Sequence, residues 1–313
     1  MYFPYFRGKQ YELVLLKEQA NKTLKSGKII PIIEPVKENL NPLQRAIEQF
    51  DINNVTYILI VNPENGDFKD QRNIKLLDFI KKLQNSNLII GIVANATTIL
   101  ENVKQYLDSF KDYKIAILHK SFLDATGLSN LLQNYSIEYN IFISNEENKR
   151  YIRKFKNIGK KVIIKDGFKR QKNANYPPIE HFSDLHLEYS DGVMDGFGDF
   201  LIVGDDYSES GGPAWAVAIH MTYLDSNDDN DMYIKHYISD RRDDIQDTSG
   251  KFIEALKYLI EDEKKNHLYN TDASKEYEEL YKKKLFRGLG YVKKLSMQNH
   301  LEIIARFLEE IDV

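Results

Sequence analysis

Short apolar runs rich in β-branched residues alternate along the chain with longer polar segments. Eight of these runs have the length and composition of strands: residues 29–35, 55–63, 88–94, 114–120, 139–144, 160–166, 200–205 and 214–223. Most are almost continuously apolar, which is typical of parallel strands that are covered on both faces. The pattern therefore predicts an α/β protein with a parallel sheet and crossover helices.

The segments between the runs carry the spacing of amphipathic helices. Leu76, Leu77 and Ile80 follow such a spacing, and Leu128 and Leu132 repeat it. Through the sixth run, strand starts recur at intervals of roughly 22 to 33 residues, which is close to the length of one βα unit. We therefore predict an irregular (β/α)8 TIM-barrel-like fold, with a doubly wound open sheet as the alternative. The irregularity lies after residue 166, where the helical period is lost.

The last third of the chain has a different organisation. A polar turn, LDSNDDNDMY, joins the run that ends at residue 223 to a further strand-like stretch and predicts a hairpin. Apolar stripes then predict C-terminal helices; their members are Phe252, Ala255, Leu256, Leu259 and Ile260 in one stripe and Leu301, Ile304, Phe307, Leu308 and Ile311 in the other. We expect residues 1–240 to form the barrel-like domain and residues 241–313 to form helices packed on that same domain.

Composition narrows the classes of function. The 313 residues are 42% hydrophobic and 29% charged, with a formal net charge of −4, so nucleic-acid binding is not supported by charge. The chain has no cysteine, which excludes disulfides, thiolate catalysis and cysteine-bound metal centres. No apolar run approaches the length of a membrane span, and the N-terminal segment lacks the apolar core of a signal peptide. We expect a cytoplasmic protein without a membrane partner.

Candidate chemistry comes from the strand ends, because barrels and open α/β sheets place their sites at the carboxyl ends of the strands. The polar residues at these ends are Glu34, Asn62, Asn95, His119, Lys120, Ser144, Lys165, Asp166, Asp205, Asp206 and His220. Glu34, Asp166 and Asp205 are candidate ligands of Mg²⁺ or another divalent cation. As catalytic candidates we take Glu34, His119, Lys120 and Asp166, with His119 as acid or base. Lys120, or alternatively Lys165, is the candidate nucleophile or phosphate partner.

A second candidate site is the segment GDDYSESGGP, residues 204–213. It follows the seventh predicted strand, where barrels often build phosphate sites. The hydroxyl of Ser208 and the backbone amides of Gly211 and Gly212 are candidate anion ligands, but Asp205, Asp206 and Glu209 would repel a phosphate unless a cation intervened. A tight turn without a ligand is the alternative.

Two motifs resemble the beta protein family, an uncharacterised group in bacteria and phages. They are YFPYFRGKQYE, which leads through a helix into IIPIIEP, and GFGDF, which precedes a predicted strand. The resemblance implies a barrel-like fold and a setting in phage defence or mobile elements, without an established reaction. The residues that it singles out are Arg7, Lys9, Glu12, Glu34, Gly198 and Asp199, of which Arg7 and Lys9 are candidate ligand-binding residues.

Two functional hypotheses follow. The first is a non-catalytic component of a phage-defence or mobile-element conflict system, with a protein partner encoded nearby. The alternative is a divalent-metal-dependent hydrolase that acts on a phosphate-bearing or other anionic small molecule.

Overall fold

The structure is a computed structural model that describes residues 1–69, 73–83, 85–143, 149–191, 194–209 and 214–310. The chain forms two compact units. The first comprises Met1–Asp166 and Glu188–Phe200, and the second comprises Gly167–Leu187 and Leu201–Val313. The boundary expected at residue 240 does not coincide with this division, because the strands at residues 179–183, 218–225 and 231–238 belong with the C-terminal helices.

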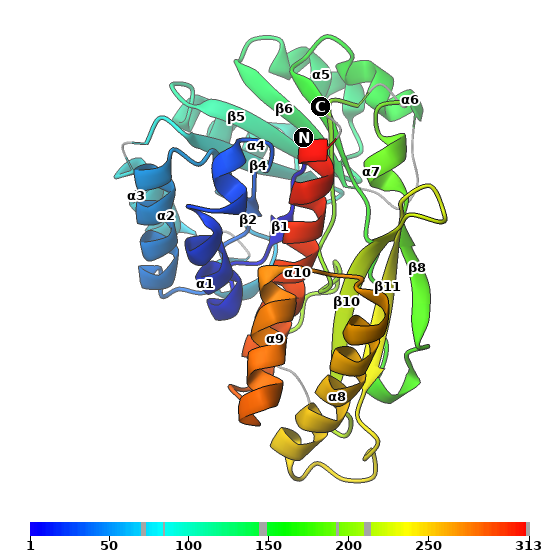
Figure 1. Cartoon of the computed structure of the whole chain (residues 1–313). Helices are drawn as coiled ribbons and strands as arrows, with labels where there is room; N and C mark the ends of the chain where they lie inside the picture. The colour runs from blue at the N-terminus through cyan, green and yellow to red at the C-terminus, as the bar shows by residue number, and fades with distance from the viewer. Residues whose placement is uncertain (70–72, 84, 144–148, 192–193, 210–213, 311–313) are drawn as a thin grey trace. The chain divides into compact units, whose positions relative to one another are not determined.

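The first unit contains an eight-stranded parallel sheet whose strand order follows the chain (Figure 1). Its strands are β1 (Tyr5–Phe6), β2 (Ile32–Ile33), β3 (Tyr57–Ile60), β4 (Leu88–Asn95), β5 (Lys114–Lys120), β6 (Ile137–Ile143), β7 (Lys160–Ile164) and β9 (Gly196–Gly198). The N–H of Phe3 donates to the carbonyl of Phe197 at 2.8 Å, and the N–H of Tyr5 donates to the carbonyl of Asp199 at 2.9 Å. These bonds bring the first and last strands together, so the predicted α/β TIM-like barrel is confirmed.

Helices connect the barrel strands. They are α1 (Gln10–Gln19), α2 (Asn41–Asn53), α3 (Ile74–Lys81), α4 (Leu100–Ser109), α5 (Ala125–Leu132) and α6 (Lys149–Ile152), with 3-10 turns η1 (Thr23–Ser26), η2 (Gly66–Phe68) and η3 (Arg153–Phe155). The helix α2 illustrates why these segments fold locally. It starts with a proline in its first turn, buries Leu43, Ile47 and Phe50 on one face, and ends at Asn54 in the left-handed conformation. The predicted helices around Leu76 and Leu128 are confirmed as α3 and α5.

Alternate residues of the strands fill the interior of the barrel. One buried cluster takes Phe3 and Tyr5 from the first strand region, Ile30 and Ile32 from the second, and equivalent alternate residues from the others: Ile58, Ile60, Ile89, Val93, Ala116, Leu118, Tyr139, Ile141, Ile143, Val162, Ile164 and Phe200. Side chains two residues apart on a strand point to the same side of the sheet. This parity identifies which residues point inward at the strand ends.

Two of the eight predicted strands are wrong as barrel strands. Residues 201–203 form a turn, and Gly196–Gly198 supplies the eighth strand. Residues 218–225 form β10, which belongs to a separate antiparallel sheet. The first barrel strand is β1, which the pattern missed because the strand has only two residues and is flanked by Pro4 on one side and by Arg7 and Gly8 on the other. The glycines of GFGDF therefore lie within a strand and not before one.

The second unit pairs a three-stranded sheet with three long helices. Its elements are η4 (Asn173–Asn175), β8 (Ile179–Ser183), α7 (Leu185–Glu188), β10 (Ala218–Asp225), β11 (Asp231–Ile238), α8 (Thr248–Asn266), α9 (Asp272–Lys283) and α10 (Leu289–Glu310). The sheet order is β10-β11-β8, and β10 pairs antiparallel with β11 from Ala218↔Ile238 to Asp225↔Asp231. The predicted hairpin is confirmed. The predicted apolar stripes are buried in α8 and α10, except for Ile311, which lies outside the described residues.

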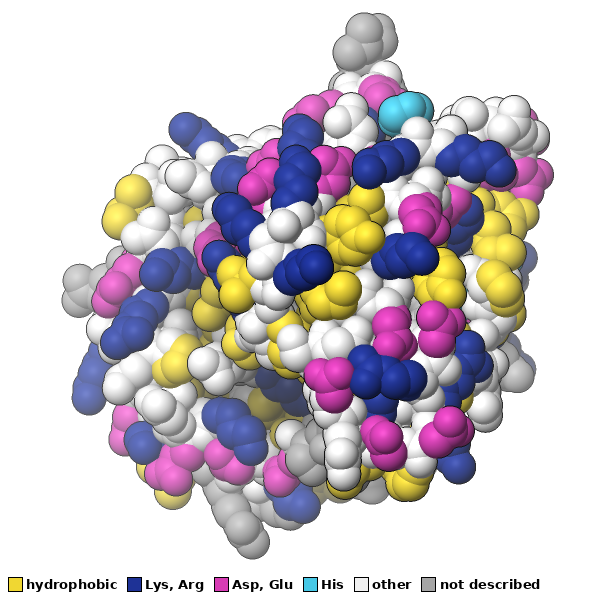
Figure 2. All heavy atoms as spheres, turned by 60° about the horizontal axis from the view of Figure 1, so that its bottom comes forward, with side chains coloured by type: hydrophobic (Ala, Val, Ile, Leu, Met, Phe, Trp, Pro, Cys, Tyr) yellow, Lys and Arg dark blue, Asp and Glu magenta, His cyan; other side chains and the backbone are white. Residues whose placement is uncertain are grey.

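The surface carries both signs of charge. Figure 2 shows Lys and Arg side chains interspersed with Asp and Glu over the face that it presents. Such a mixture is typical of a solvated protein surface. In the part of the chain that the structure describes, no helix combines the length and the apolar character that crossing a membrane requires.

We expect Gly198→Ala to destabilise the barrel. A Cβ atom on Gly198 would lie 2.1 Å from the carbonyl oxygen of Phe3, and backbone at the junction of the first and last strands has little room to shift. The free energy of unfolding should fall by about 2–3 kcal/mol, as for other overpacked positions. Urea unfolding followed by far-UV circular dichroism measures the loss.

Gly27→Ala is the matched control for this substitution. Gly27 has a φ of +73°, and a Cβ atom on it would have no other heavy atom within 4 Å, so alanine there meets only backbone strain of about 1 kcal/mol. Equal losses of unfolding free energy in the two variants would show that the close approach of Phe3 to Gly198 does not contribute to the cost of the alanine substitution.

Candidate functional site at the barrel mouth

At the carboxyl ends of five consecutive barrel strands, the residue that points into the barrel is polar. By parity with the buried cluster, these residues are Arg7, Glu34, Asn62, Asn95 and Lys120. Each comes two residues after an inward apolar side chain, so each continues the interior of the barrel toward its mouth. This is the end at which barrel enzymes build their active sites.

Glu34 is the centre of the first half of this mouth. Its side chain is 1% exposed, and Arg7 Nε lies 3.1 Å from its Oε2. The hydroxyl of Tyr5 donates to the same oxygen at 3.0 Å. The other oxygen, Oε1, accepts from the backbone N–H of Glu64 at 2.8 Å and from the backbone N–H of Asn65 at 3.1 Å. The carboxylate thus ties β1, β2 and the loop after β3 together.

Aromatic rings surround the Arg7 end of this ion pair. The guanidinium carbon of Arg7 lies 5.2 Å from the ring centre of Tyr5 and 5.3 Å from that of Phe200. Both distances are within the range of cation–π attraction. Burial, together with the charge of Glu34, raises the pKa of Tyr5 well above its ordinary value, so Tyr5 keeps its proton and donates a hydrogen bond to Glu34. The pair is therefore a packed, preorganised unit.

The second half of the mouth is open to solvent. Glu64 lies 3.3 Å from Lys120 Nζ through its Oε2, and its Oε1 accepts from Asn95 Nδ2 at 2.7 Å. The side chains of Lys120 and Glu64 are 33% and 22% exposed. The side-chain amide of Asn62 donates through Nδ2 to the carbonyl of Val93 and accepts through Oδ1 from the N–H of Val93, at 2.8 Å each. A continuous set of contacts therefore runs from Arg7, directly after β1, to Lys120 at the end of β5.

His119 does not join this set. Its neighbours on β5, Leu118 and Lys120, point inward, so the imidazole lies on the other side of the sheet. There it packs between aromatic rings, 4.6 Å from Phe142 and 4.4 Å from Phe155 between ring centres. The expectation that His119 lies beside Glu34 as an acid or base at the same site is therefore corrected.

The hydrogen bonds of His119 define its protonation. Asn140 donates through Nδ2 to the carbonyl of Ile158 at 2.5 Å, so its Oδ1 is the acceptor for His119 Nε2 at 2.8 Å. His119 Nδ1 is then left to accept from the hydroxyl of Tyr151 at 2.9 Å. Burial lowers the pKa of His119 to about 4, with the bond to Asn140 opposing the shift. The imidazole is neutral at physiological pH and acts as a structural core residue.

The three expected metal ligands do not form a cluster. Across the described ranges, no group of three or more histidine or acidic side chains is arranged to hold a metal ion. Asp166 follows β7 in the first unit, whereas Asp205 belongs to the second unit. Both oxygens of Glu34 already accept hydrogen bonds from the protein, and one faces a guanidinium, which disfavours a cation.

The remaining predicted site residues lie elsewhere. Lys9 caps the start of α1, and its backbone N–H is 3.5 Å from a carboxylate oxygen of Glu12. Ser208 is half-buried in the second unit, while Gly211 and Gly212 lie outside the described residues. Asp199 follows β9 and accepts from the hydroxyl of Tyr2 at 2.7 Å. Burial, followed by the charge of Asp199, raises the pKa of Tyr2.

Glu64 and Asn65 are site residues that the sequence did not predict. They follow β3 in the turn PENG, beyond the strand end where candidates were sought. Gly66 has a φ of +73°, and a Cβ there would lie 2.1 Å from the carbonyl oxygen of Val36. The Asn-Gly dipeptide shortly after an apolar strand is the signal that identifies this close turn.

No protein-family model matches the sequence, and no curated protein is significantly similar to it.

Proposed function

We propose that the mouth of the barrel binds a small polar molecule with an anionic group, and that Lys120 is its principal ligand. The observation that supports this proposal is the difference between the two ion pairs of the mouth. The Arg7–Glu34 pair is buried and held by further donors, whereas the Lys120–Glu64 pair is partly exposed. Exposed pairs contribute only about 0–1 kcal/mol, so an incoming anion exchanges with Glu64 at little cost.

The buried Arg7–Glu34 pair holds the backbone of the proposed site in a fixed position. Arg7 and Glu34 connect three strand ends and position the backbone of Glu64 and Asn65. The amide of Asn95, which bonds Glu64 at 2.7 Å, adds a neutral donor near Lys120. Sites that combine a rigid support with one exchangeable charge suit a small ligand that enters and leaves.

Two narrower hypotheses stay predictions. A divalent-metal-dependent hydrolase would need ligands other than the set Glu34, Asp166 and Asp205, for the reasons given above. A role in phage defence or a mobile-element conflict system, with a partner encoded nearby, rests on the resemblance to the beta protein family alone. A cytoplasmic location rests on composition alone.

Lys120→Gln tests the proposed site. In isothermal titration calorimetry with ribose 5-phosphate and with malonate, we expect wild-type protein to bind at least one of the two anions. The affinity should fall at least about tenfold in the variant, because one charge-assisted contact is lost. The matched control is Lys114→Gln, an exposed lysine at the opposite end of the same strand β5. Equal affinity in the two variants, or no binding by wild type, would reject the proposal.

A further inference from the structure

The second unit contains a pocket of its own, with a volume of about 640 Å³. It lies where β11 extends past the end of β8: the two strands pair from Met232↔Ser183 to Lys235↔Ile179, and β11 continues to Ile238. The pocket lining includes Pro178, which precedes β8, and His236 and Ile238 from the part of β11 that extends beyond β8. Its volume is within the range of small-molecule sites, about 300–1,000 Å³.

Three tyrosines, two isoleucines and a proline give the pocket its apolar lining. Ile179 and Tyr258 are 43% and 41% exposed, so large apolar side chains remain open to solvent. The hydroxyl of Tyr176 accepts from the N–H of Gln171 at 3.1 Å, and its ring stacks on His236 at 4.5 Å. Tyr258 donates to Asp240 at 2.7 Å. Both rings are thus held in place, as a site for a flat apolar group requires.

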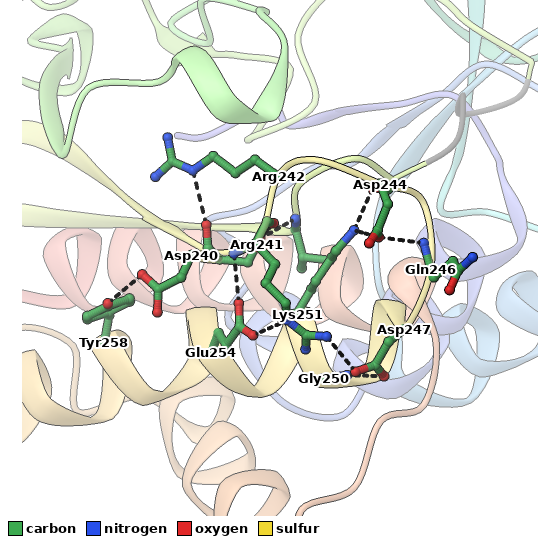
Figure 3. A network of polar contacts seen from close by, with 12 residues as sticks. Asp240, Arg241, Arg242, Asp244, Gln246, Asp247, Gly250, Lys251, Glu254 and Tyr258 are labelled. Carbon is green, nitrogen blue, oxygen red and sulfur yellow. Dashed lines mark hydrogen bonds and ion pairs between the residues drawn. The ribbon is translucent and has the colours of Figure 1, made fainter.

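Two adjacent arginines differ in their partners, as Figure 3 shows. Arg241 contacts the carboxylates of Asp247, at 2.9 Å, and Glu254, and so its charge is neutralised by the start of α8. The guanidinium of Arg242 instead donates Nε to the carbonyl of Ser239 and Nη1 to the carbonyl of Ala174, at 3.2 Å each. Within the described ranges, Arg242 makes no ion pair.

The charge balance of the lining follows from this difference. Lys235 and Asp262 also line the pocket and pair with each other at 2.7 Å. The charge of Arg242 is then the uncompensated one, in a chain whose formal net charge is −4. A guanidinium that two carbonyls hold in a fixed orientation presents its remaining N–H groups to a carboxylate or phosphate.

We propose that this pocket binds a small organic anion with a flat ring, whose phosphate or carboxylate pairs with Arg242 and whose ring lies against Tyr176 and Tyr258. The proposal is independent of the barrel mouth, because every lining residue belongs to the second unit. Arginine supplies the charge recognition, and the aromatic lining selects for the ring.

Isothermal titration calorimetry with AMP, indole-3-acetate and adenosine tests this proposal. We expect the wild-type protein to bind AMP or indole-3-acetate and to bind uncharged adenosine at least about tenfold more weakly. Binding of AMP alone identifies the anionic group as a phosphate, and binding of indole-3-acetate alone identifies it as a carboxylate. If neither anion binds, or if adenosine binds as tightly as AMP, the proposal is wrong.

The variants locate the binding. Arg242→Gln should lower the affinity for the anion at least about tenfold. Arg242→Lys keeps the charge and should retain part of the affinity. Arg287→Gln is the matched control, because Arg287 is exposed in the same unit and pairs with Glu276 outside the pocket lining. Lys120→Gln should leave this binding unchanged, which separates the pocket from the barrel mouth. Wild-type affinity in Arg242→Gln, or an equal loss in Arg287→Gln, would overturn the assignment.

Discussion

Glu34→Ala should lower the free energy of unfolding by about 3–5 kcal/mol, the usual cost of breaking a buried ion pair. The substitution removes the charge that pairs with Arg7 and the acceptor for the hydroxyl of Tyr5 and the backbone N–H groups of Glu64 and Asn65. These donors lie in a site where Glu34 is 1% exposed, so water replaces the carboxylate poorly. Urea unfolding at pH 7, followed by far-UV circular dichroism, measures the effect.

Glu34→Gln separates the charge from the hydrogen bonds. The amide keeps one acceptor oxygen for the backbone of Glu64 and Asn65 but loses the charge that faces Arg7, and we expect a smaller loss than with alanine. A Glu34→Ala variant within about 1 kcal/mol of wild type would contradict a structural role for this carboxylate. Glu34 would then again be a group that is free to act on a ligand.

The second large effect is a loss of stability in acid that originates from His119. The pKa of His119 is lowered to about 4 in the folded protein, whereas an unfolded histidine takes up a proton near pH 6.5. Above pH 6.5 neither state is protonated, and the contribution is complete. As the pH falls from about 6.5 to 4, only the unfolded state gains the proton, so stability decreases by about 2–3 kcal/mol.

His119→Gln removes this proton uptake and should therefore lose less stability than wild type between pH 7 and pH 4. The comparison uses the difference between the two pH profiles, so acidic groups common to both proteins cancel. Tyr151→Phe is the matched control: it deletes the donor to Nδ1 but keeps the burial that is the main cause of the shift, and its profile should follow wild type. Parallel profiles for wild type and His119→Gln would show that His119 titrates normally.

Much of the barrel could be predicted from the sequence, because β3 to β7 are buried on both faces and leave nearly continuous apolar runs. The strands that meet to complete the sheet left no such signal. The strand β1 has two residues, and β9 is Gly-Phe-Gly. Both are defined by pairing with distant residues, such as Phe3 with Phe197, and a local pattern carries no information on such pairing.

The candidate site was predictable in part for a related reason. The rule that strand ends carry the chemistry found Glu34, Asn95 and Lys120, which the structure connects through Glu64. The rule does not tell which of two adjacent residues points inward. On β5 the side chains that point to either side of the sheet are apolar, so the sequence does not distinguish His119 from Lys120. In the structure Ala116 and Leu118 belong to the buried cluster inside the barrel, so Lys120 points inward and His119 outward.

The short strand β9 has a consequence for the order in which the protein is made. The segment 167–187 belongs to the second unit, and only afterwards does the chain return to supply β9. A nascent chain that has emerged as far as residue 187 therefore holds seven barrel strands, with β1 and β7 still lacking the neighbour that they share. Unpaired strand edges are templates for association with other chains. Until Gly196–Gly198 leaves the ribosome, nascent copies on one messenger RNA thus expose strand edges that can pair with one another.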